Sequence, residues 1–145
     1  MSRRLESLAS ASGVADLVHF EGAVSDVGPY LRRIHVGVLC SDREGLSNAI
    51  LEYMAYGLPI IATRVGGNVE LVAEDNGMLV AADDADQLAS ALQTLLRDSE
   101  HRASLGRHSR EKALAMFSWD KSMNDLEHYY QTLAAKRATD PSRSQ

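Results

Sequence analysis

The segment that decides the fold is SDREGLSNAILEYMAYGLPIIATRVGGNVE, residues 41–70. Within it, residues 46–56 carry apolar side chains at helical spacing and Gly57 ends the pattern, so we predict a helix there. The apolar run at residues 59–63 follows directly and predicts a buried strand. A helix that leads straight into a buried strand is typical of a parallel sheet in an α/β domain.

Two glutamates in this segment, Glu44 and Glu52, are separated by seven residues. Glu44 is expected in the loop before the helix, and Glu52 about two turns inside it. Eight helical positions would span about 12 Å, a reach that suits the two ends of a nucleotide diphosphate sugar. Because the first N–H groups of a helix lack partners and attract anions, the pattern predicts an anion site at the start of this helix.

The rest of the chain alternates between predicted strands and helices. We predict strands at residues 18–20, 36–40, 59–63 and 77–80, and further helices at 3–12, 26–33, 68–73, 84–97, 99–116 and 118–133. The fold class is therefore α/β, a Rossmann-like parallel sheet of about four strands with flanking helices, followed by C-terminal helices. We expect one domain at residues 1–135 and a disordered polar tail at 136–145.

Composition narrows the class of protein. The chain has 145 residues with 45% apolar residues, enough for one domain with its own core. A net charge of −5 argues against a general nucleic-acid binder. The single cysteine, Cys40, excludes an internal disulfide, fits a reducing cytoplasm and, at the end of a strand, is expected to be a buried thiol. No apolar run approaches the length of a membrane span.

The glutamate pair and its surroundings resemble a known family. The Glu-seven-residues-Glu motif, the preceding residues 5–39, the closing strand 77–80 and Phe117-Ser118-Trp119 are similar in order to the group 1 glycosyltransferases (family four, GT-B fold). The resemblance extends over residues 5–133. It implies a retaining transferase that takes a sugar from a nucleotide diphosphate sugar, linked to UDP or GDP above all, with no cofactor and no metal.

The resemblance also assigns roles to single residues. It implies that Glu44 contacts the transferred sugar close to the reaction centre, where it is the candidate catalytic residue. It implies that Glu52 accepts hydrogen bonds from the ribose hydroxyls, which suits a carboxylate with two acceptor oxygens. The competing interpretations are an acid favoured by the helix dipole at Glu44 and an ordinary exposed helix glutamate at Glu52.

The remaining candidate residues bind the donor through the backbone. The resemblance implies that the turn into the helix contacts the diphosphate and sugar, that one residue lines the nucleobase pocket and that a double glycine lies near the sugar. These residues are Gly45, Leu46, Ser47 and Asn48 in the turn, Val24 in the pocket, and Gly66 and Gly67 in the glycine loop. Helix capping, strand-end packing and simple turn formation are the alternatives for them.

The family pattern also predicts what surrounds this chain. The segments match strands three to six of a six-stranded sheet, so the first two strands, their diphosphate-binding arginine and lysine, and the acceptor domain are expected upstream. The chain is then the C-terminal, donor-binding part of the enzyme, inactive by itself. We expect a glycan or lipid-linked acceptor bound through that missing domain, and a cytoplasmic location with membrane association of the complete enzyme left open.

Three alternatives remain from the sequence. One is a nucleotide-sugar-binding half that catalyses nothing alone and works only with another chain. A second is a truncated module that folds but has no function. The third, a receiver-like signalling module, is disfavoured because no acidic cluster ends the early strands. With either of the first two, we also expect that a sheet edge left open by the missing strands allows self-association.

Overall fold

The computed structural model of the protein describes residues 2–138. The chain divides into two compact units, Met1–Arg33 and Ile34–Gln145. No helix within residues 2–138 is long and apolar enough to cross a membrane.

The first unit is helical. It contains α1 (Ser2–Ala11), a short 3-10 helix η1 (Ala15–Leu17) and α2 (Gly28–Leu31). As predicted, Pro29 lies in the first turn of α2, where a missing N–H has no consequence. Asp26 Oδ1 accepts a hydrogen bond from the Gly28 N–H at 2.9 Å, which fixes the start of this helix.

The predicted strand at residues 18–20 is absent. Val18 has an extended backbone, but Val18 and Phe20 are exposed and neither belongs to a sheet in the described part of the chain. A strand exists through the backbone hydrogen bonds to its neighbour, and apolar β-formers alone do not supply them. The prediction of about four strands was therefore wrong by one.

The second unit is built on a parallel sheet of three strands in the order β1-β2-β3, namely β1 (Gly37–Leu39), β2 (Ile60–Thr63) and β3 (Gly77–Val80). Gly37 lies opposite Ile60, and Ile60 lies opposite Gly77. β2 lies in the centre, and its four residues are all buried. This continuous apolar run is what a parallel strand covered on both faces requires.

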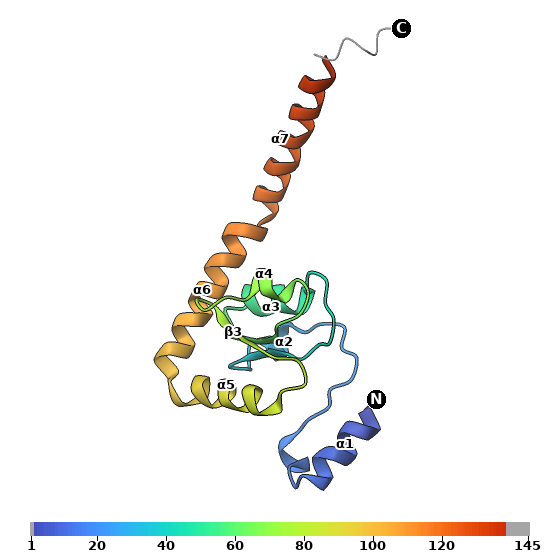
Figure 1. Cartoon of the computed structure of the whole chain (residues 1–145), viewed down its shortest axis with the longest axis vertical. Helices are drawn as coiled ribbons and strands as arrows, with labels where there is room; N and C mark the ends of the chain where they lie inside the picture. Colours follow the sequence, from blue (N-terminus) through green and yellow to red (C-terminus); the bar gives the residue numbers. More distant parts are fainter. Residues whose placement is uncertain (1, 139–145) are drawn as a thin grey trace. The chain divides into compact units, whose positions relative to one another are not determined.

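Helices cover both faces of this sheet (Figure 1). α3 (Asn48–Ala55) and α4 (Asn68–Leu71) pack on one face, and α5 (Ala85–Arg97) packs on the other. α6 (Ser99–Phe117) contacts both α3 and α5, and α7 (Trp119–Ala138) follows it and contacts it.

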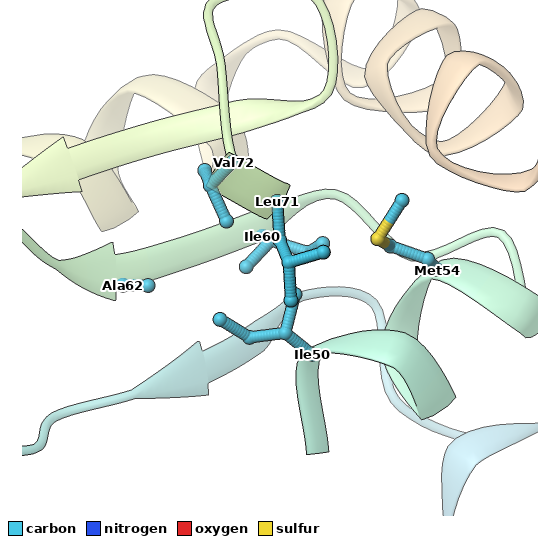
Figure 2. Packing of buried hydrophobic residues seen from close by; sticks show 6 residues of the cluster. All are labelled: Ile50, Met54, Ile60, Ala62, Leu71 and Val72. Carbon is cyan, nitrogen blue, oxygen red and sulfur yellow. The ribbon is translucent and has the colours of Figure 1, made fainter. Parts of the chain in front are cut away.

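Two hydrophobic clusters hold the layers together. On the first face Ile50 and Met54 of α3 meet Ile60 of β2, together with Ala62, Leu71 and Val72 (Figure 2). On the second face the core consists of Ile61, Val80, Ala91, Leu95 and Leu105. Because successive strand residues point to opposite faces, Ile60 and Ile61 serve different clusters, and each such buried side chain contributes about 1.5–3 kcal/mol.

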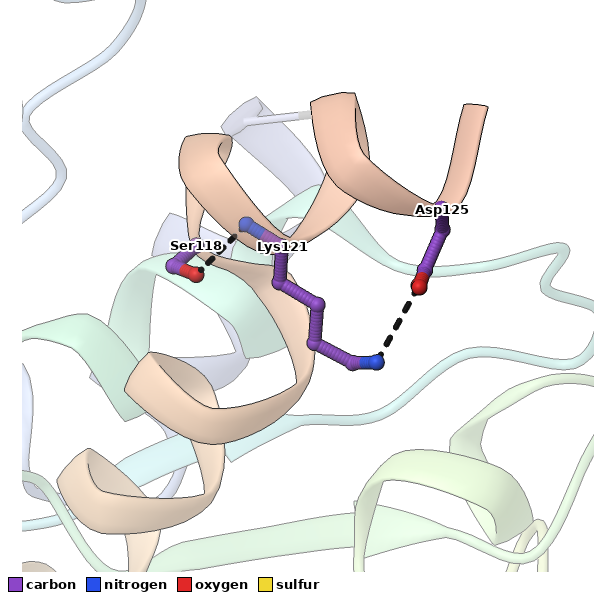
Figure 3. Close-up of polar contacts among 3 residues, drawn as sticks. All are labelled: Ser118, Lys121 and Asp125. Carbon is purple, nitrogen blue, oxygen red and sulfur yellow. Dashed lines mark hydrogen bonds and ion pairs between the residues drawn. The ribbon is translucent and has the colours of Figure 1, made fainter. Parts of the chain in front are cut away.

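Side-chain caps set the ends of the later helices. Asp84 and Asp98 each accept a backbone N–H at 2.8 Å, at the starts of α5 and α6. Ser118 Oγ accepts the Lys121 N–H at 3.2 Å, and the Lys121 ammonium pairs with Asp125 at 3.1 Å one turn further on (Figure 3). α7 continues to Ala138 and so includes the first three residues of the predicted disordered tail. Residues 139–145 of that predicted tail lie outside the described residues.

Candidate functional site

The candidate site begins where β1 and β2 end side by side. Thr63, the last residue of β2, is buried. It makes two hydrogen bonds to a single residue, Ser41, which lies in the loop after β1. Its Oγ1 accepts from the Ser41 N–H at 3.0 Å and donates to the Ser41 carbonyl at 2.7 Å. The Thr63 side chain thus joins the two strand ends beyond the last paired residues of β1 and β2.

Ser41 in turn holds the carboxylate of Glu44. The Ser41 hydroxyl donates to Glu44 Oε1 at 2.6 Å, and the Glu44 side chain is half-buried. This distance lies in the short part of the range for O–H···O hydrogen bonds. The acid predicted as catalytic is therefore fixed at the carboxyl ends of two parallel strands, the edge at which open α/β sheets bind ligands.

A helix N-terminus follows directly. Ser47 is the N-cap of α3, and its buried Oγ accepts from the Ile50 N–H at 3.4 Å. The first N–H groups of a helix have no acceptor within the helix. Those before Ile50 therefore point out of the N-terminal end of α3. The capping interpretation of Ser47 is confirmed.

Glu52 lies closer to the helix start than predicted. α3 begins at Asn48, so Glu52 is in its second turn, and its side chain is exposed. Since residues 44–47 form a loop, the helical rise that gave about 12 Å between Glu44 and Glu52 applies only to part of the interval. The neighbours Ile50 and Met54 are fully buried, so α3 turns its apolar side to the sheet and Glu52 to solvent.

The double-glycine loop packs against the same segment. A Cβ on Gly66 would overlap the Glu44 carbonyl, and a Cβ on Gly67 would overlap the Gly45 carbonyl. Gly66 also has a φ of 47°, which side chains disfavour. Two backbones can therefore touch only because glycines stand at these positions, and the structure brings the 44–45 and 66–67 segments into contact. That the double glycine lies near the sugar stays a prediction.

The other candidate residues occupy different environments. Gly45, Leu46 and Asn48 are exposed, and a Cβ added to Gly45 would have no neighbour within 4 Å. Val24 belongs to the first unit, where it is half-buried. The proposed contact of Val24 with a nucleobase stays a prediction.

A cavity of about 350 Å³ opens at the carboxyl ends of the three strands. It is lined by residues that follow or end each strand, among them Cys40, Thr63 and Val80, and by the start of α5. Cys40 is exposed, so the expectation of a buried thiol was wrong, because the strand ends at Leu39 and the next residue already leaves the sheet.

Tyr53 of α3 is a half-buried titratable group that contacts β1. Burial raises its pKa above 10.0, and the neighbouring Glu52 and Cys40 raise it further. Its hydroxyl donates to the Val38 carbonyl at 3.3 Å. Among residues 2–138, no group of three His, Cys, Asp or Glu side chains is arranged to hold a metal ion.

A comparison with known protein families identifies the family of this chain. Residues 1–98 match the sequence model of the family described as glycosyl transferases group 1. The chain belongs to this family. The group 1 match confirms the family that the glutamate motif and its surroundings predicted.

Similar proteins agree with the family and the fold. The lipopolysaccharide core biosynthesis glycosyltransferase LpsE of Rhizobium meliloti is 34% identical over 91% of this chain and 38% of its own length. HepE of Anabaena, solved with UDP, superposes with a TM-score of 0.83 at 23% identity, over 92% of this chain and 36% of its own. The C-terminal domain of a group 1 family protein, LpcC of Francisella tularensis, superposes with a TM-score of 0.75 at 25% identity. The match covers 81% of this chain and 63% of that domain's chain.

These matches locate the chain within the larger proteins. It spans well under half of LpsE and of HepE, but most of the isolated C-terminal domain of LpcC. The predicted Rossmann-like α/β class is supported, and so is the prediction that the chain corresponds to the C-terminal part of a group 1 glycosyltransferase.

Two site residues, Ser41 and Thr63, were missed by the sequence analysis. Their bonds connect positions 22 residues apart, which no local pattern reveals. One signal was available, since each hydroxyl residue stands at the end of a predicted strand, and neighbouring parallel strands end at the same edge of a sheet.

Proposed function

We propose that this chain is the donor-binding part of a retaining glycosyltransferase. The complete enzyme transfers a hexose-type sugar from a nucleoside diphosphate to a glycan or lipid-linked acceptor. The observation that carries the proposal is the position of the Glu44 carboxylate, which Ser41 holds 2.6 Å away at the carboxyl end of the sheet, beside the start of α3.

Each part of this site suits one part of the donor. The free N–H groups at the start of α3 suit the diphosphate, whose negative charge increases as the bond to the sugar breaks. Glu44 suits the sugar, because its negative charge stabilises the positive character that develops at the anomeric carbon. Glu52, exposed in the second turn, suits the ribose diol.

A titration tests the proposal on this chain. ¹⁵N-labelled protein is titrated to millimolar concentrations with UDP, UDP-glucose, GDP and GDP-mannose, and backbone amide shifts are followed. UDP-glucose is included because HepE is solved with it. We expect the largest shifts at residues 44–48 and 66–67. Shifts confined to other segments, or none at all, would contradict the proposal.

Transfer itself needs more than this chain in our proposal. The chain spans about a third of HepE, and all the site residues described here concern the donor. Incubation of the isolated chain with UDP-glucose and an excess of simple acceptors is expected to release UDP at the background rate. Enzyme-dependent release of UDP would disprove the donor-only assignment.

A further inference from the structure

The carboxylate of Glu44 is held by a series of hydrogen bonds that starts in the core. Buried Asn68, at the start of α4, donates from Nδ2 to the Thr63 carbonyl at 3.0 Å. Thr63 Oγ1 exchanges two bonds with the backbone of Ser41, at 3.0 and 2.7 Å. The Ser41 hydroxyl then donates to Glu44 Oε1 at 2.6 Å.

The direction of each bond in this series is determined. A threonine hydroxyl has one proton, and Thr63 uses it on the Ser41 carbonyl while its lone pair accepts the Ser41 N–H. Ser41 likewise has one hydroxyl proton, and Glu44 receives it. Glu44 Oε2 and the remaining lone pair of Oε1 are left to accept hydrogen bonds from a ligand.

The backbone of Glu44 is held independently of its side chain. Gly66 packs against the Glu44 carbonyl so closely that a Cβ there would overlap it. A glutamate side chain in water samples many rotamers, and fixing it before a ligand binds removes part of the entropic cost of recognition.

We propose that Ser41, held by Thr63, is a positioning residue that orients Glu44 for the sugar of the donor, so that this pair of hydroxyls controls recognition of the sugar and leaves recognition of the nucleotide unaffected. The inference rests on the proposed function. It differs from a purely structural role for Ser41, which would alter folding or affect both parts of the donor equally.

The main experiment compares two ligands that differ only by the sugar. Dissociation constants for UDP and UDP-glucose are measured by amide shifts on the 145-residue chain, for the wild type, Ser41→Ala and Ser41→Thr. Ser41→Ala is expected to weaken UDP-glucose binding about fivefold while UDP binding changes less than about twofold, because only the bond that orients Glu44 is lost. Ser41→Thr retains the hydroxyl and is expected to restore binding of UDP-glucose.

The possible results distinguish the positioning role of Ser41 from the proposed binding of the donor. If the wild type binds both ligands and Ser41→Ala changes both constants equally or neither, the positioning role is disproved and donor binding stands. If the wild type binds neither ligand, the proposed function is disproved and the inference with it.

A second measurement needs no ligand. Hydrogen exchange of the Ser41 amide is expected to be at least about tenfold faster in Thr63→Val than in the wild type, since valine lacks the acceptor. Thr63→Ser is expected to stay close to the wild type. Thr94→Val, an exposed threonine bonded only within α5, is the matched control and is expected to leave Ser41 unchanged. Equal Ser41 exchange in Thr63→Val and the wild type would disprove the link between Thr63 and Ser41.

Discussion

The carbonyl oxygen of Glu44 lies against the α-carbon of Gly66, leaving no space for a side chain between the two loops. One loop carries the acid of the candidate site and the other connects β2 to α4, so the contact fixes their separation. Gly66 also adopts a left-handed backbone with a φ of 47°. Both properties require glycine at this position.

Gly66→Ala is therefore expected to destabilise the fold by about 2–5 kcal/mol, the sum of the left-handed backbone cost and the overlap with Glu44. Gly57→Ala is the matched control, because Gly57 has a φ of 70° but an added Cβ would make only ordinary contacts, the nearest at 3.5 Å. That control should cost about 1–2 kcal/mol. Urea unfolding of both variants measures the difference, and equal costs would show that the two loops do not touch.

Gly45→Ala is expected to separate binding from stability. A Cβ at Gly45 meets nothing within 4 Å, so the free energy of unfolding should change by less than about 1 kcal/mol. If the diphosphate approaches this backbone closely, the added methyl group should weaken UDP binding about tenfold. Calorimetric titration with UDP, alongside urea unfolding, tests this. Undiminished affinity would remove Gly45 from the diphosphate site.

Glu52→Ala is expected to weaken UDP binding about tenfold or more, because a charge-assisted hydrogen bond to the ribose is lost. Glu52 is exposed, so its removal should change the free energy of unfolding by less than about 0.5 kcal/mol. Glu111→Ala, an exposed glutamate within α6, is the control and should leave both quantities unchanged. The ribose assignment fails if Glu52→Ala and Glu111→Ala bind UDP equally well.

Most helices and strands of the second unit were predicted from the sequence, because their type and their starts depend on residues that are close together in the chain. Asp84 caps α5 as expected and Gly77–Val80 forms β3, since a cap and a short apolar run are determined by adjacent residues. Val18 and Phe20 look equally strand-like but form no strand, because pairing depends on distant residues. Likewise the glutamate motif predicted where Glu44 lies but not the hydrogen bonds from Thr63 and Ser41 that fix its carboxylate.

Tyr53→Phe is expected to change stability in a pH-dependent way. At pH 7 the loss of the hydrogen bond to the Val38 carbonyl should cost about 1 kcal/mol. The pKa of Tyr53 is raised above 10.0, first by burial. A raised pKa contributes stability that is fully present below the unfolded value of 10.0 and is lost as the pH rises through the folded value.

The wild type should therefore lose its advantage over Tyr53→Phe above pH 10.0. Urea unfolding at pH 7 and at several alkaline values measures the difference, with Tyr130→Phe on exposed α7 as the control. A difference that stays constant over this range would contradict the effect of burial on the Tyr53 pKa.

β1 lies at the end of the strand order in the described sheet, so one of its edges has no neighbouring strand there. The Gly37 N–H donates to the Pro59 carbonyl on the β2 side. Because backbone groups alternate in direction along a parallel strand, those of Val38 point away from β2. The hydroxyl of Tyr53 already bonds the Val38 carbonyl, so an added strand would have to displace it.

We propose that this edge pairs with a second copy of the chain and that Tyr53 weakens the pairing. Sedimentation equilibrium of the wild type should reveal a weak dimer. Tyr53→Phe should lower its dissociation constant about fivefold, because the Val38 carbonyl is then free to accept a hydrogen bond from the second copy. Val38→Pro removes the outward N–H and should abolish the dimer while β1 stays paired with β2. Leu39→Pro, which removes an inward N–H, should instead disrupt the fold, as circular dichroism would show. A strict monomer for both the wild type and Tyr53→Phe would exclude association through this edge.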